Sequence, residues 1–152
     1  MSAPLNLLEV ATDARPARPA GFRSSSVQAG PLIGAAALGA SVYDLEPGES
    51  ICPYHYEHGN EEWLLVLDGA PTLRHPDGEE ELEPWDVVCF AEGPEGAHEV
   101  TNRTDARVRV VMFSTKHKPA VFVYPDSGKI AVEPPGHVFR LADEVDYWED
   151  ES

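Results

Sequence analysis

Short apolar runs separated by turn-forming residues dominate the chain from position 39 onward. Each run is rich in Val, Leu, Tyr or Phe, and Pro, Gly or Asp stands between the runs. Regular short strands with such turn signals are typical of a β-sandwich or barrel. The pattern therefore predicts an all-β fold, with its clearest hairpin from Arg74 to Glu79 around an Asp-Gly turn. The predicted strands cover residues 39–45, 63–68, 71–75, 86–90, 106–115 and 120–125.

The same pattern divides the chain into three parts. Residues 1–30 are rich in Pro, Ala, Arg and Ser without periodicity, which predicts an N-terminal arm or loop. Residues 31–142 carry the strand pattern and form the predicted barrel domain. Residues 143–152 form a predicted acidic C-terminal tail with six acidic residues around Tyr147 and Trp148. The two aromatic side chains favour docking of this tail on the domain.

Composition narrows the class of partner. The 152 residues are enough for one domain with its own core. Asp and Glu number 27 against 11 Lys and Arg, a formal net charge of −16, so we expect neither nucleic acid nor an anionic membrane as a partner. The longest apolar run, residues 31–40, is about half of a membrane span. Two cysteines make no disulfide framework, and residues 1–10 lack the features of a secretory signal, so we expect a cytoplasmic protein.

Four side chains between positions 55 and 98 are candidates for metal binding. His55 and Glu57 are two residues apart, so on a strand they project from the same face. A turn at 58–60 would return the chain and let Glu62 face the same interior, and His98 follows a later loop. Two imidazoles and two carboxylates are suitable ligands for a divalent cation. Spacing alone leaves open whether they converge or whether the carboxylates belong to a solvated acidic turn.

The segment from Gly48 to Gly69 resembles the first motif of the cupin superfamily, G-x5-H-x-H-x(3,4)-E-x6-G. His55 matches its first His, Glu62 its Glu and Gly69 its final Gly. Residues 85–102 resemble the second cupin motif, G-x5-P-x-G-x2-H-x3-N.

In that second segment Gly93 matches the second Gly, and His98 and Asn102 match the His and Asn after two extra residues. Trp85 and Ala91 stand in place of the first Gly and the Pro. The whole resemblance covers about residues 39–115. It implies a double-stranded β-helix (jelly roll, the cupin barrel) that binds a metal inside through three His and one Glu.

The chain departs from these motifs at a ligand position. Glu57 stands where the second His of the first motif belongs. With Glu57 as a ligand, two neutral His and two carboxylates would make a divalent site formally neutral. The added oxygen donor favours Mn or Fe, with Zn and Ni as the other candidate metals. His58 is the alternative ligand to Glu57, but a regular strand points it to the opposite face, so it would need a β-bulge.

The resemblance implies a small metal-dependent cupin enzyme, an isomerase, lyase or dioxygenase, acting on a small organic molecule. The alternative is a non-catalytic barrel with a decayed metal site, which binds a small ligand or has a structural role. Cupins of this kind commonly dimerise, so we expect a homodimer. We expect inward-facing positions near Val42, Leu65, Val88 and Met112 to line the cavity.

Overall fold

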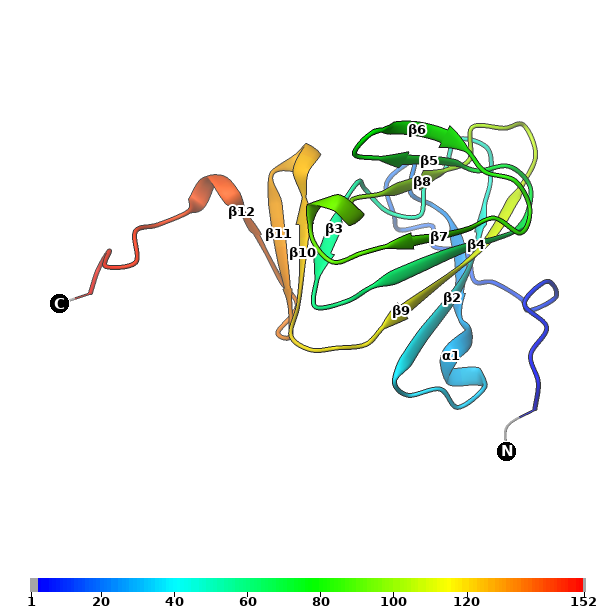
Figure 1. The fold of residues 1–152 in the computed structure, drawn as a ribbon, viewed down its shortest axis with the longest axis horizontal. Helices are drawn as coiled ribbons and strands as arrows, with labels where there is room; N and C mark the ends of the chain where they lie inside the picture. The colour runs from blue at the N-terminus through cyan, green and yellow to red at the C-terminus, as the bar shows by residue number, and fades with distance from the viewer. Residues whose placement is uncertain (1–2, 152) are drawn as a thin grey trace.

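The computed structural model describes residues 3–151 and shows a double-stranded β-helix built from antiparallel strands (Figure 1). One sheet has five strands in the order β1 (Ser25–Gln28), β2 (Leu38–Leu45), β9 (Val108–Thr115), β4 (Glu62–Asp68) and β7 (Val87–Phe90). A second has four, β12 (His137–Arg140), β11 (Lys129–Glu133), β10 (Ala120–Tyr124) and β3 (Tyr56–His58). A third has three, β6 (Gly78–Glu81), β5 (Thr72–His75) and β8 (Glu99–Thr101). The helical elements are α1 (Ala29–Leu32), η1 (Pro94–Gly96), η2 (Pro125–Ser127) and η3 (Leu141–Asp143).

The predicted all-β fold is confirmed, and each of the six predicted segments contains a strand. The predicted hairpin is formed by β5 and β6, in which His75 pairs with Gly78. The two residues of its turn are Pro76 and Asp77, and the glycine begins the second strand. Proline fixes the φ angle that the first central position of a turn requires, so the turn lies one residue earlier than predicted.

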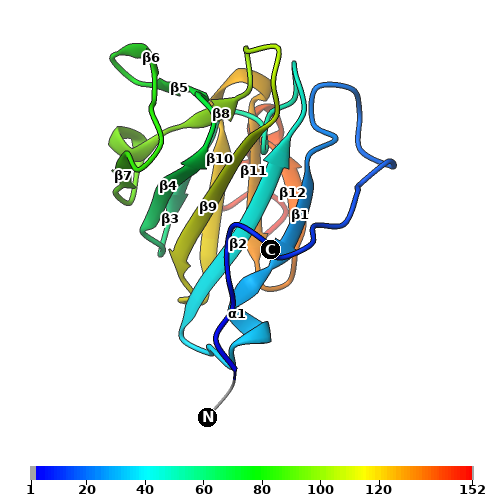
Figure 2. The same ribbon diagram turned by 90° about the vertical axis from the view of Figure 1, so that its right-hand side faces the viewer.

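Two apolar clusters lie on opposite faces of the five-stranded sheet. The first fills the barrel and includes Leu64 and Val110, both fully buried. The second lies on the outer face, where Leu5 and Leu7 of the N-terminal segment pack against the buried Val42 and its neighbours. Figure 2 shows this segment, in dark blue, crossing the face of β2. The sheet is therefore covered on both faces over part of its width.

Hydrogen bonds hold the N-terminal segment in place. The buried Arg109 guanidinium pairs with the Asp44 carboxylate at 3.0 Å. The same guanidinium donates to the carbonyl of Leu7 at 3.0 Å and to the carbonyl of Val10. The predicted arm of residues 1–30 also contains β1, which pairs with β2 along four residues. Part of the predicted arm is therefore an edge strand of the barrel.

The C-terminal segment extends away from the barrel after β12 (Figure 1). Tyr147 is 82% exposed and Trp148 72% exposed, so the expectation that these aromatic side chains dock on the domain is wrong. The surrounding carboxylates would lose hydration on docking, and no basic residue of residues 3–151 forms an ion pair with them. Within the described part of the chain, no helix has the length and apolar character that crossing a bilayer requires.

Candidate metal centre

A reciprocal pair of backbone hydrogen bonds brings His55 and His98 together. The His98 amide donates to the His55 carbonyl at 2.8 Å, and the His55 amide donates to the His98 carbonyl at 3.1 Å. The two imidazole rings consequently lie side by side, with centroids 4.7 Å apart. The structure therefore confirms that these two residues, distant in sequence, converge inside the barrel.

Backbone carbonyls orient both rings. The Nδ1 atom of His55 lies 3.0 Å from the carbonyl oxygen of Pro53. The Nδ1 atom of His98 lies 2.9 Å from the carbonyl oxygen of Gly96. A ring that donates its Nδ1 proton to a carbonyl keeps Nε2 free as a ligand, which is the usual arrangement around metal-binding histidines. Phe90 stacks on the His98 ring at 3.7 Å and restricts its rotation further.

Glu62 completes a compact set of three ligand atoms. Its Oε2 atom lies 3.4 Å from Nε2 of His98 and 3.9 Å from Nε2 of His55. The three atoms all lie within 4.8 Å of one another. Ligands about 2.1 Å from one ion lie roughly 3.0–3.4 Å apart in octahedral or tetrahedral geometry. Small side-chain movements would therefore bring these three atoms onto a single cation.

Glu57 lies beside this set. Its Oε1 atom is 3.8 Å from Nε2 of His55, and its Oε2 atom accepts a hydrogen bond of 3.3 Å from Asn60. The Asn60 amide oxygen accepts in turn from the His117 backbone amide at 2.8 Å. This network orients the Glu57 carboxylate next to the other three groups, where it can act as a fourth ligand. His58 is exposed on the opposite face of β3, and the structure does not bring it to the cluster.

Burial and mutual contact shift the pKa values of the clustered groups. Burial and the neighbouring Glu57 charge raise the pKa of Glu62 to about 7. Burial and the adjacent His55 lower the pKa of His98 to about 3. Burial alone would lower the pKa of His55, but hydrogen bonding to Cys52 and Glu57 outweighs it and raises that pKa. Because no Lys or Arg of residues 3–151 pairs with either carboxylate, a divalent cation fits this donor set.

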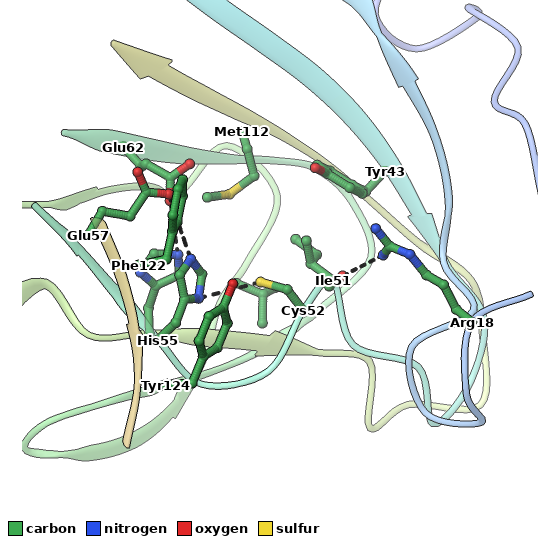
Figure 3. A pocket seen from close by; sticks show the side chains of 12 residues that line it. Arg18, Tyr43, Ile51, Cys52, His55, Glu57, Glu62, Met112, Phe122 and Tyr124 are labelled. Carbon is green, nitrogen blue, oxygen red and sulfur yellow. Dashed lines mark hydrogen bonds and ion pairs between the residues drawn. The ribbon is translucent and has the colours of Figure 1, made fainter. Parts of the chain in front are cut away.

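The cluster forms one end of a cavity of about 190 Å³ inside the barrel (Figure 3). Of the positions near which lining residues were predicted, Met112 lines it and so does Tyr43, next to Val42, whereas Leu65 and Val88 do not. Val42 packs on the outer face of the sheet instead. Lining residues that the sequence analysis did not identify include Arg18, Tyr43, Cys52, Phe122 and Tyr124.

Only some of these residues left a signal in the sequence. Tyr43 alternates with Leu45 along one strand, so the correct choice of inward face would have identified it. Arg18 lies in a segment without periodicity, and no local pattern points to it.

Comparisons with known proteins place the fold. A sugar phosphate isomerase from Silicibacter pomeroyi has a similar structure, with a TM-score of 0.80 and 23% identity over 97% of this chain and 98% of that one. A candidate sugar phosphate isomerase from Acidithiobacillus ferrooxidans gives a TM-score of 0.82 and 22% identity, covering 92% of this chain and 91% of the other. The polyketide cyclase RemF from Streptomyces resistomycificus gives a TM-score of 0.61 and 21% identity, covering 79% of this chain and 84% of that one. No curated protein matches the sequence significantly.

The sequence itself identifies the family. Residues 41–114 match the family described as the cupin domain, and this range includes all four predicted ligands. The observed double-stranded β-helix and the similar solved structures agree with that match. The chain belongs to the cupin superfamily.

Proposed function

We propose that this protein binds a divalent cation inside the barrel and acts there on a small organic molecule. His55, Glu62 and His98 would hold the cation, with Glu57 as the fourth ligand. The observation that carries the proposal is the position of the two Nε2 atoms, which lie 3.4 and 3.9 Å from one carboxylate oxygen. Both imidazoles have their Nδ1 atoms next to backbone carbonyls. Such orientation before binding is characteristic of a metal site and has no role in a solvated acidic turn.

The cavity supports isomerisation as the reaction class. A bound divalent cation would supply Lewis acidity toward a carbonyl or enediol oxygen of the substrate. Tyr43 and Tyr124 line the cavity, and burial raises the pKa of both phenols. Each phenol therefore stays protonated at neutral pH and can donate a hydrogen bond to a substrate oxygen. Two structures that match more than nine-tenths of the chain are described as sugar phosphate isomerases, one of them as a candidate, which agrees with this class.

The size and polarity of the cavity limit the substrate. A volume of about 190 Å³ is below the roughly 300–1,000 Å³ of pockets that take drug-sized ligands. Apolar side chains such as Ile51, Val100 and Met112 occupy the wall between its polar groups. The cavity therefore suits a compact molecule with polar groups at its ends.

Metal titration of matched variants tests the proposal. Protein purified without an affinity tag and stripped with EDTA is titrated with Mn²⁺ by calorimetry. We expect about one ion per chain in the parent, and binding at least a hundredfold weaker in Glu62→Gln because a direct ligand is lost. Glu61→Gln is the control, since the Glu61 side chain is exposed and accepts the Trp63 indole hydrogen bond. Equal affinity in the parent and Glu62→Gln would contradict the proposal.

Hydrogen exchange separates catalysis from binding alone. An isomerase that moves a proton next to a carbonyl exchanges that proton with solvent, so small hydroxy-aldehydes and hydroxy-ketones incubated in D2O should gain deuterium. The Mn²⁺-loaded parent and Glu61→Gln should catalyse this exchange, and Glu62→Gln should not. Metal binding without exchange on any compound that binds would support the non-catalytic alternative.

A further inference from the structure

The Arg18 side chain lines the cavity at a distance from the candidate metal centre. It comes from the N-terminal segment, and Figure 3 shows it across the cavity from Glu57 and Glu62, with Ile51 and Cys52 between. Its Nη1 atom donates to the carbonyl of Ile51 at 3.1 Å. Within residues 3–151 this is the one acceptor that the guanidinium contacts, and no carboxylate pairs with it. A guanidinium carries five donors, so most of them remain available to a ligand.

Among the described residues, Arg18 lacks a carboxylate partner although the chain is rich in carboxylates. Acidic residues outnumber basic ones by 27 to 11, and several other arginines form ion pairs. The arginines paired with a carboxylate are Arg74, Arg103, Arg107 and Arg109. Arg18 lines a cavity whose two lining carboxylates, Glu57 and Glu62, belong to the candidate metal centre. Its charge is therefore available for an anion that enters from outside.

The position of Arg18 is built into the fold. The segment that carries it is fixed before Arg18, where Arg109 binds the carbonyls of Leu7 and Val10. It is fixed again after Arg18, where the Ser50 amide donates to the Gly21 carbonyl at 2.7 Å. In addition, the Arg23 guanidinium donates to the Arg18 carbonyl at 3.1 Å. These contacts hold the backbone on both sides of the guanidinium, so its place at the cavity is not that of a free surface side chain.

We infer that Arg18 forms an oxyanion subsite, and that the substrate carries a carboxylate or phosphate at the end opposite the oxygen atoms that face the metal centre. This inference rests on the proposed function and adds the substrate class. Arginine binds carboxylate and phosphate oxygens through two parallel hydrogen bonds, which also fixes the direction of the ligand. The Tyr43 side chain lines the same region of the cavity and supplies a further donor. A negatively charged protein without such a subsite would disfavour an anionic substrate.

A matched pair of ligands tests the subsite. Dihydroxyacetone phosphate and dihydroxyacetone share one hydroxy-ketone and differ by the phosphate, and hydroxypyruvate offers a carboxylate instead. Their affinities for the Mn²⁺-loaded protein are measured by calorimetry. We expect the parent to prefer one or both anionic ligands over dihydroxyacetone by about tenfold to a hundredfold, the range for a charge-assisted hydrogen bond. The anion with the larger preference distinguishes phosphate from carboxylate recognition.

Two variants locate the effect. Arg18→Gln should abolish the preference for the anion, and Arg18→Lys should keep part of it. Arg103→Gln, a surface arginine paired with Glu79, is the control and should behave as the parent does. All variants should bind Mn²⁺ equally, so a failure of metal binding in the parent counts against the proposed function and not against the subsite. For that case, inorganic phosphate is titrated into metal-free parent and Arg18→Gln. Equal anion affinity in these two proteins, in either titration, would overturn the inference.

Discussion

Replacing Glu62 with Gln should stabilise the metal-free protein at neutral pH. Burial, followed by the charge of Glu57, raises the pKa of the Glu62 carboxyl from 4.5 to about 7. The carboxyl therefore ionises more easily in the unfolded chain than in the folded protein. Stability that is fully present below pH 4.5 is lost as the pH rises through about 7.

The size of the effect follows from the two pKa values. One pH unit corresponds to about 1.4 kcal/mol, so the loss reaches about 3 kcal/mol above pH 7. The Glu62 side chain is 15% exposed, so solvent screens this cost only weakly. Gln has nearly the same shape and no charge, and it avoids this loss. Below pH 4.5 the parent carries a neutral carboxyl there too, so the two proteins should have similar stability.

Urea denaturation in EDTA at about pH 4 and pH 8 measures this difference. We expect the free energies of unfolding to agree at the lower pH and Glu62→Gln to be more stable by about 3 kcal/mol at the higher pH. Glu61→Gln should follow the parent at both. Adding Mn²⁺ at about a hundred times its dissociation constant should stabilise the parent by about 2.7 kcal/mol and leave the variant nearly unchanged. A stability difference between Glu62→Gln and the parent that does not change with pH would refute this reasoning. A Glu62→Gln variant less stable than the parent at pH 8 would refute it too.

Three further substitutions test the surroundings of the site. Gly96→Ala would place Cβ 1.9 Å from the Ala91 carbonyl oxygen, so the loop whose Gly96 carbonyl contacts the His98 ring must shift. We expect weaker Mn²⁺ binding by calorimetry. Parent-like affinity would contradict the role of this loop in orienting His98. Arg109→Met leaves the buried Asp44 carboxylate without its closest cationic partner and should lower the free energy of unfolding by about 3 kcal/mol in urea denaturation. A loss below about 1 kcal/mol would contradict this role of Arg109. Trp63 is 48% exposed, and we place the predicted homodimer contact on the surface around it. Light scattering should then give twice the 16.6 kDa chain mass for the parent and the mass of one chain for Trp63→Lys. A monomeric parent would show the dimer prediction to be wrong.

Strand positions were predictable from sequence because apolar runs and turn residues are local signals. The choice of inward face was not. The prediction placed part of the cavity wall near Val42 without fixing the register: Tyr43 lines the cavity, and Val42 is fully buried on the outer side. Alternation of apolar and polar residues identifies the core when one face meets water. Here Leu5 and Leu7 cover the outer face, so both faces select apolar residues and the alternation no longer distinguishes them.

The remaining strands depend on their pairing partners more than on their own sequence. Strand β1 has the polar sequence Ser-Ser-Val-Gln and exists because it pairs with β2. Strands β11 and β12 are separated by Pro134, Pro135 and Gly136, and the sequence analysis assigned no strand there. Each of these strands is specified by a partner, and a single-sequence pattern contains no information about that partner.

The candidate site was predictable to the extent that it lies in two motifs. His55, Glu62 and His98 converge as expected, and Glu57 lies beside them. Arg18 was missed because its position depends on hydrogen bonds such as those from Arg109 to the N-terminal segment. The candidate metal ligands therefore lie in two recognisable motifs, whereas the residue proposed to select the substrate depends on tertiary contacts.

Anomalous diffraction from a crystal grown with Mn²⁺ tests the central claim most directly. We predict one strong peak inside the barrel, about 2.0–2.3 Å from Nε2 of His55, Nε2 of His98 and a carboxylate oxygen of Glu62. The same map shows whether Glu57 is the fourth ligand. No peak at this position at saturating Mn²⁺, or a peak coordinated by His58 in place of these residues, would contradict the account.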